Sequence, residues 1–361
     1  MKSLYSMFLS QAYQDCWDDY NRSVKLKNFP RWDYVILTAS NDQQAEGFRR
    51  QIEERKEYLP AGTRFAAIPD RGGERVGSGG ATLEVLKYLH EQEGDFRKLR
   101  VLVIHSGGDS KRVPQYSALG KLFSPVPHQL PDGRSSTLFD EFMICMSSVP
   151  SRIREGMVLL SGDVLLLFNP LQIDYNNVGA AAISFKECVE VGKNHGVYVN
   201  GEDGNVKCCL QKKSEEELRK AGAVNEVGCV DIDTGALIFS TAMMDSLYSL
   251  IRTEEGYDRY VNGTVRLSLY ADFLYPLAEN STLEQFYLEK PEGEFCEELT
   301  EAREQVWKVL RPYRMKLLRL APAKFIHFGT TKEILALMCG VCQPWLEQPC
   351  GKQHQRQHGR V

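Results

Sequence analysis

Short aliphatic runs alternate with amphipathic segments along at least half of this chain, and this alternation is the strongest constraint on its fold. The runs Trp32–Ala39, Leu99–Ile104 and Met157–Val164 have strand character. Between them, Gln43–Tyr58 and Glu84–Glu91 carry apolar residues at helical spacing. Such alternation is typical of an α/β protein with an open, mainly parallel sheet and helices on both faces.

The same patterns predict how the chain is divided. Residues 1–31 are predicted to form an N-terminal helical extension, because Tyr13, Cys16, Trp17 and Tyr20 recur at helical spacing. Residues 32–338 are predicted to form the main domain. Residues 339–361 show neither helical nor strand periodicity, so we expect a disordered tail there.

Charge and cysteine usage exclude several classes of protein. The net charge of −4 argues against a nucleic-acid surface, and no apolar run approaches the length of a membrane-spanning helix. The segment Met1–Ser10 is too polar for a signal peptide, and the ten cysteines are scattered. We therefore expect a cytoplasmic protein with reduced thiols that acts on small molecules, without a nucleic-acid or membrane partner.

A glycine turn with two cations follows the predicted strand Leu99–Ile104. Gly107 and Gly108 allow the backbone to turn sharply and to approach a ligand closely. Arg112 can donate a forked pair of hydrogen bonds to phosphate, and Lys121 adds a point charge. These residues predict a cradle for a nucleoside triphosphate, and the alternative is an ordinary loop with surface charges.

A second glycine-rich segment precedes a predicted helix. Gly77, Ser78, Gly79 and Gly80 lie at its start, where backbone N–H groups can bind an anion or approach a base. The segment lacks the spacing of the dinucleotide-binding fingerprint, and the stretch that ends at Lys121 lacks that of a P-loop.

Three further sites could complete such a centre. Asp163 ends a predicted strand and could hold Mg²⁺ beside the phosphates, although an aspartate that caps a helix is the alternative. Lys212 could meet a second phosphate or be part of a solvated lysine pair. His195, between Asn194 and Gly196, could bind a sugar hydroxyl or serve a structural turn.

Several separated stretches together are similar to the fucose pyrophosphorylase family of sugar-1-phosphate nucleotidyltransferases, which includes the nucleotidyltransferase part of bifunctional fucokinase/fucose-1-phosphate guanylyltransferases. The resemblance covers about residues 32–338. It rests on the order and spacing of residues 75–83, 105–112, 120–127, 161–164, 194–198, 211–212 and 325–335.

The resemblance implies a Rossmann-like nucleotide-sugar transferase fold with a mostly parallel central sheet. It also implies the reaction of GTP with L-fucose 1-phosphate to give GDP-L-fucose and pyrophosphate, with Mg²⁺ as cofactor. Arg112 and Lys121 would neutralise the triphosphate, Lys212 would bind the sugar phosphate, and Asp163 would bind the metal. A second metal carboxylate is expected among Asp231, Asp233 and Asp272; Asp272 can equally be structural.

Other expectations follow from where the chain departs from the family. Long members continue into a β-helical region and bifunctional ones into a kinase domain, whereas this sequence ends soon after Leu335. We therefore expect a chain truncated before either region, by an altered reading frame. The alternative functions are an L-fucokinase, because Val76–Thr82 superficially resembles a kinase glycine-serine loop, and a catalytically inactive nucleotide-binding fragment.

Overall fold

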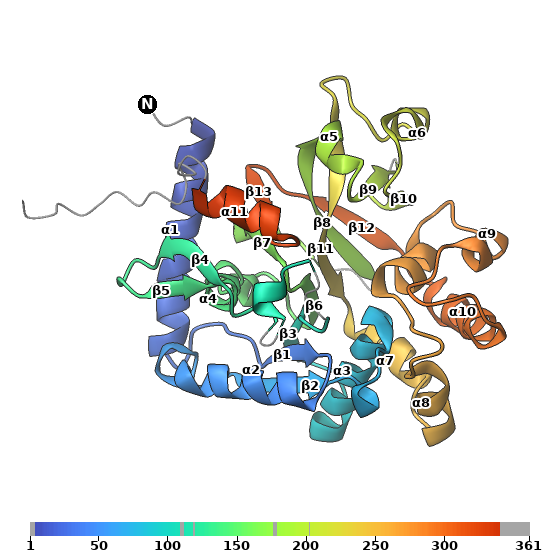
Figure 1. Cartoon of the computed structure of the whole chain (residues 1–361), viewed down its shortest axis with the longest axis horizontal. Helices are drawn as coiled ribbons and strands as arrows, with labels where there is room; N and C mark the ends of the chain where they lie inside the picture. Colours follow the sequence, from blue (N-terminus) through green and yellow to red (C-terminus); the bar gives the residue numbers. More distant parts are fainter. Residues whose placement is uncertain (1–3, 109–111, 118–119, 176–178, 202, 340–361) are drawn as a thin grey trace, which may run out of the picture.

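The fold is built around one large mixed sheet with helices on both faces (Figure 1). The computed structural model describes residues 4–108, 112–117, 120–175, 179–201 and 203–339. In these ranges the central sheet has nine strands: β1 (Tyr34–Ala39), β2 (Arg64–Pro69), β3 (Arg100–His105), β6 (Gly156–Ser161), β8 (Ala180–Cys188), β9 (Gly196–Asn200), β10 (Val206–Gln211), β11 (Cys229–Phe239) and β12 (Met315–Arg319).

The order of the first strands determines where a ligand can bind. Strand β1 pairs in parallel with β2 on one side and with β3 on the other, and β3 pairs in parallel with β6. The chain therefore reverses its direction of winding between β1 and β3. In open α/β sheets such a switch leaves a crevice outside the carboxyl ends of the two strands, which is the usual place for a ligand.

The remainder of the sheet is less regular than predicted. Strand β11 runs antiparallel to β6, β8 and β9, and β10 runs antiparallel to β9. Strand β12 then pairs in parallel with β8. The prediction of a mostly parallel α/β sheet is confirmed, since the strands other than β10 and β11 share one direction.

Two apolar clusters lie on opposite faces of the sheet. Leu9, Phe48 and Phe139 belong to one of them, and Leu83, Met243 and Val306 to the other. The helices that supply these residues are α1 (Leu4–Lys25), α2 (Asp42–Glu54), α4 (Leu138–Cys145), α3 (Gly77–Glu93), α7 (Thr241–Ser249) and α10 (Glu297–Leu310). No helix in the described part of the chain combines the length and apolar character that crossing a bilayer requires.

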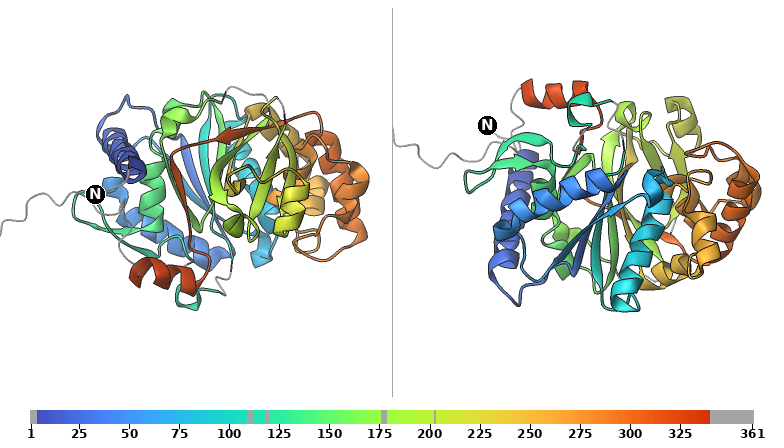
Figure 2. Two further views of the ribbon diagram at one scale, coloured as in Figure 1. Left: turned by 90° about the horizontal axis from the view of Figure 1, so that it is seen from above. Right: turned by 60° about the horizontal axis from the view of Figure 1, so that its bottom comes forward.

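The N-terminal helix predicted from periodicity is present as α1. It packs beside α4 and strand β7 (Val164–Phe168), as Figure 2 shows. Leu9, Cys16 and Trp17 are buried in the cluster that α4 also lines. The helix thus completes one face of the core.

The predicted strand Met157–Val164 is wrong at its end. Strand β6 stops at Ser161, and the chain turns through Gly162 and Asp163 into β7. The turn is held against the neighbouring strand, because the Gly162 N–H donates to the His105 carbonyl at 2.9 Å. A Cβ on Gly162 would lie 2.7 Å from that oxygen, so the turn requires glycine.

A C-terminal segment returns to this turn. Strand β13 (Ala323–His327) pairs antiparallel with β7, and α11 (Thr331–Cys339) follows it. The predicted tail beyond residue 339 lies outside the described residues. The smaller elements are β4 (Pro125–Gln129), β5 (Ser135–Thr137), α5 (Val189–Gly192), α6 (Glu215–Lys220), α8 (Glu254–Tyr260) and α9 (Leu283–Leu288).

Candidate active site

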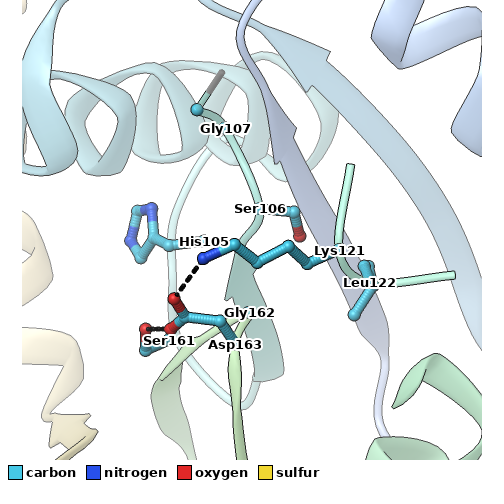
Figure 3. Close-up of a pocket in the computed structure, with 9 residues that line it drawn as sticks. His105, Ser106, Gly107, Lys121, Leu122, Ser161, Gly162 and Asp163 are labelled. Atoms are coloured by element: carbon cyan, nitrogen blue, oxygen red, sulfur yellow. Dashed lines mark hydrogen bonds and ion pairs between the residues drawn. The ribbon is translucent and has the colours of Figure 1, made fainter. Parts of the chain in front are cut away.

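A polar pocket lies at the carboxyl ends of β3 and β6 (Figure 3). Gly107, Gly108, Lys121 and Asp163 line it, and Figure 3 shows Lys121 in contact with Asp163. No described atom lies within 4 Å of where a Cβ on Gly108 would be, and its φ of +143° favours glycine. The structure thus brings together four of the predicted site residues.

Lys121 and Asp163 form the charged centre of this pocket. The Lys121 ammonium donates to Asp163 Oδ2 at 2.9 Å, and the Ser161 hydroxyl donates to Asp163 Oδ1 at 2.8 Å. Burial raises the pKa of Asp163, but Lys121, His327 and Ser161 together outweigh it and hold the pKa below its ordinary value. Asp163 is therefore ionised at neutral pH and available to a cation.

His327 and Glu333 lie at the site, although sequence patterns assign neither of them a role there. His327 Nε2 lies 3.7 Å from Asp163 Oδ2, and its Nδ1 lies 3.0 Å from Glu333 Oε1. Glu333 also accepts from the Thr330 hydroxyl at 2.8 Å, which fixes the carboxylate at the start of α11. The Thr330-x-x-Glu333 pattern is a capping-box signal that could have located this helix start.

Arg112 and Lys212 do not line this pocket. The Arg112 side chain is exposed, and its carbonyl accepts from the Thr331 N–H at 3.0 Å, which ties the loop to α11. Lys212 is also exposed, with a φ of +49°, and its N–H donates to the His195 carbonyl at 3.1 Å. Their predicted roles as phosphate ligands remain predictions.

The segment Asn194-His195-Gly196 lies next to the pocket. The His195 ring centroid is 5.3 Å from those of Phe325 and His327, and Asn194 and His195 line a hollow with these residues. Gly196 has a packing role, because a Cβ there would lie 2.7 Å from Gln211 Nε2. Through His327, this hollow adjoins Asp163.

The glycines at the start of α3 pack against a neighbouring segment, and Gly77 and Ser78 also line a pocket, so the predicted role of this segment in nucleotide binding stays a prediction. The Gly79 and Gly80 N–H groups donate to the Leu267 carbonyl at 2.7 and 3.3 Å, and the Ser78 N–H donates to Glu292 at 3.3 Å. A Cβ on Gly77 or Gly79 would lie 2.3 or 2.9 Å from the Leu267 oxygen. Gly77 and Gly79 thus allow the start of α3 to pack closely against the backbone at Leu267. The N–H groups of residues 78–80 already donate hydrogen bonds within the protein.

Gly77→Ala is expected to lower the free energy of unfolding by about 3 kcal/mol, since it combines a left-handed backbone (φ +79°) with a backbone collision. Gly94→Ala, at the other end of the same helix, is the matched control. Gly94 has a φ of +81° with open space around its Cβ position, so we expect a loss of about 1 kcal/mol. Urea denaturation measures both, and equal losses would contradict the packing role.

Asp272 occupies a buried ion pair and does not line the pocket. Its Oδ1 accepts from Arg303 Nε at 2.8 Å and its Oδ2 from the Ser268 N–H at 2.6 Å, with no exposed side-chain surface. The prediction of a metal role is wrong here, because both oxygens are used and inaccessible. Asp231 pairs with Lys186 at 2.9 Å, and Asp233 accepts from the Gly235 N–H at 2.9 Å.

A second pocket continues from the first toward β1 and β2. The two share His105, Gly107 and Gly108, and the second is bounded by Asp70 and Glu292. Burial lowers the pKa of His105 to about 4, so the ring is neutral; it lies 3.4 Å from the Thr38 hydroxyl. Burial, together with the negative charges of Glu84 and Glu292, raises the pKa of Asp70 to about 7. The hydrogen bond from the Val76 N–H and the charge of Arg75 lower this pKa, but by less.

The raised pKa of Asp70 predicts a pH-dependent stability. Between its ordinary value of 3.8 and about 7, folded Asp70 holds a proton that the unfolded chain has released, so stability falls as the pH rises. Asp70→Asn is therefore expected to raise the free energy of unfolding by about 1–3 kcal/mol at pH 8, an effect that should disappear near pH 4. Denaturation at both pH values measures it.

The exposed Asp258→Asn is the control, since Asp258 pairs with Arg71 at the surface. We expect a change below about 0.5 kcal/mol from it. A loss of stability in Asp70→Asn at pH 8, or a gain that does not depend on pH, would contradict the predicted effect.

The fold and the pockets define an α/β protein with a charged ligand site at the switch point of its sheet. The model of the fucose pyrophosphorylase domain matches residues 94–355, and the chain belongs to that family. The predicted resemblance is confirmed.

Curated relatives agree with this assignment. The chain is 28% identical to fucose-1-phosphate guanylyltransferase of Mus musculus over 84% of its own length and 56% of the relative's. It is 27% identical to bifunctional fucokinase/GDP-fucose pyrophosphorylase of Arabidopsis thaliana, over 86% of this chain and 32% of that one. The chain thus spans about half the length of its guanylyltransferase relatives and about a third of the length of the bifunctional relative. A crystal structure of HddC from Yersinia pseudotuberculosis aligns with a TM-score of 0.39 at 12% identity, over 90% of this chain and 83% of that chain.

Proposed function

We propose that this protein is a sugar-1-phosphate guanylyltransferase that converts GTP and L-fucose 1-phosphate into GDP-L-fucose and pyrophosphate. The observation that carries the proposal is the Lys121–Asp163 pair in a pocket at the switch point of the sheet. Family membership and the names of the guanylyltransferase relatives support the same reaction.

The reaction needs charge and position rather than a protein nucleophile. An oxygen of the sugar phosphate attacks the α-phosphorus of GTP, and the bond from that phosphorus to the α–β bridging oxygen breaks, so that pyrophosphate leaves with its electron pair. Lys121, with 14% of its side chain exposed, offers a positive charge to the phosphates from a largely dehydrated position. Such pre-positioned charge stabilises a transition state more strongly than charge in water.

Asp163 fits a magnesium ion that takes most of its ligands from substrate and water. Its carboxylate is ionised, keeps 22% side-chain exposure, and borders the pocket. Mg²⁺ prefers oxygen ligands and keeps several waters, so one carboxylate together with substrate phosphates and water suits it. Such an ion would supply charge neutralisation for the leaving pyrophosphate.

The hollow beside His195 is the proposed site for the sugar phosphate. It adjoins Asp163 through His327, and Asn194 and His195 offer polar groups to hydroxyls. Lys212, which is tied to the His195 carbonyl, would bring a cation toward the same side. Arg112 would act from the exposed loop on the pyrophosphate end.

Pyrophosphate release by the purified protein with Mg²⁺, GTP and L-fucose 1-phosphate tests the proposal. We expect release from this mixture and none from ATP with free fucose, and we expect Asp163→Ala to abolish it. Asp132→Ala, whose aspartate pairs with Arg134 away from the pocket, should retain activity. Fucose phosphorylation by ATP would favour a kinase instead. Failure of the folded protein to turn over either mixture would favour an inactive nucleotide-binding protein.

A further inference from the structure

The two connected pockets form one continuous site, and the side chains at its two ends differ in the sign of their charge. The first contains Lys121, whereas the second ends at the carboxylates of Asp70 and Glu292. Arg75 also borders the second pocket, but two acidic side chains, Asp70 and Glu292, border it with this one cation. A triphosphate is therefore held at the Lys121 end and repelled from the Asp70 end.

Three backbone N–H groups at or beside the second pocket already have partners within the protein. The Ser78 N–H donates to Glu292, the Gly79 N–H to Leu267, and the Val76 N–H to Asp70. A group that enters this end with its own N–H donors matches it, because carboxylate oxygens accept hydrogen bonds and such donors favour the ionised form of Asp70. A nucleobase attached to the triphosphate supplies such N–H donors, and it would lie at the Asp70 end when the phosphates lie at the Lys121 end.

Guanine and adenine differ in what they present to a carboxylate. The Watson–Crick edge of guanine carries two neighbouring donors, N1–H and N2–H, which match the two oxygens of one carboxylate. Adenine carries an N1 acceptor beside its N6 amine and so brings a lone pair against one oxygen. With adenine, one carboxylate oxygen would be buried without a hydrogen-bond donor, and the free-energy cost of this unpaired group discriminates strongly against ATP.

We propose, resting on the proposed function, that Asp70 selects GTP over ATP by accepting hydrogen bonds from N1–H and N2–H of guanine. Asp70 follows β2 directly, at the carboxyl end of the strand next to β1. The base then lies over β1 and β2 while the phosphates lie over β3 and β6, so that one nucleotide spans the switch point. Glu292 lies at the edge of the same pocket, where it accepts from the Ser78 N–H.

Equilibrium binding of GTP, ITP and ATP to the whole chain tests the proposal. ITP keeps N1–H and lacks the N2 amine, so we expect wild-type affinity to fall about tenfold from GTP to ITP and further to ATP. Asp70→Asn is expected to weaken GTP about 10- to 100-fold, and to lower the GTP:ATP preference by at least tenfold. The asparagine oxygen can still accept from the Val76 N–H, so the variant keeps the local fold.

Asp258→Asn is the matched control and should leave the GTP:ATP preference unchanged, since Asp258 pairs with Arg71 at the surface. Equal wild-type affinity for GTP and ITP, or loss of the preference in Asp258→Asn rather than in Asp70→Asn, would overturn the assignment. If wild-type protein makes pyrophosphate from GTP while Asp70→Asn keeps the preference, the proposed function stands and the role of Asp70 falls. If the wild type binds no nucleotide, both fall.

Discussion

Replacing Lys121 by methionine is expected to lower the rate of pyrophosphate release by about 100- to 1,000-fold. The ammonium is the cation that contacts Asp163 at the centre of the pocket, and it is only 14% exposed. Charge fixed in such a place acts on the developing pyrophosphate without the reorganisation that a mobile surface lysine requires. Methionine has a similar length and no charge, so the variant removes the charge with little change in packing.

The steady-state rate with saturating GTP and L-fucose 1-phosphate is the measurement for Lys121→Met. Lys220→Met, at the exposed end of α6, is the matched control and should keep the wild-type rate. The double variant Lys121→Met/Asp163→Asn should lose much less than the product of the two single losses, because both residues act on one charged centre. A Lys121→Met enzyme within threefold of wild type would exclude a role for this lysine in the reaction.

The layout of the fold was predictable because its strands carry strong local signals. The aliphatic runs that became β1, β3 and β6 are buried along nearly their whole length, as parallel and central strands are. The antiparallel direction of β11 was not predictable, since a buried strand has the same composition in either direction.

The pair Lys121–Asp163 was identified from residue type and place after strands. Each lies near the carboxyl end of a strand that local patterning reveals, and parallel strands bring those ends to one edge. His327 was not identified, because it meets the site through a tertiary contact, whereas Asp70 follows β2 directly and carries the same signal as Asp163. His327 reaches Asp163 only when β13 pairs with β7, and the sequence separation of these strands hides that pairing.

Glycine-rich segments show why the same sequence signal has two outcomes. Gly107 and Gly108 border a pocket, whereas Gly79 packs against the backbone at Leu267 and Gly77 does both. Both are glycines between a strand and a later element, so composition cannot separate ligand approach from close packing. The distinction depends on which distant segment of the chain packs against the glycines, and only the folded structure shows that.

Replacing Arg303 by methionine is expected to lower the free energy of unfolding by about 3–5 kcal/mol. Arg303 is 1% exposed, pairs with Asp272, and donates from one guanidinium nitrogen to the carbonyls of Phe286 and Glu289 at 2.9 and 2.8 Å. Its loss leaves a buried carboxylate without its cation and two carbonyls without that donor. Both groups must then be left unpaired or draw water into the core.

Chemical denaturation of three variants separates this buried pair from surface charge effects. Lys308→Met removes an exposed ion pair with Glu304 on the same helix, α10, and should change stability by less than about 0.5 kcal/mol. Arg303→Met/Asp272→Asn should be more stable than Arg303→Met, because the unpaired charge is gone while the amide can still accept from the Ser268 N–H. A loss below about 1 kcal/mol in Arg303→Met, or no recovery in the double variant, would show that Asp272 does not depend on Arg303. The structural reading of Asp272 would then lose its main support, and a role for this carboxylate outside the core would have to be considered again.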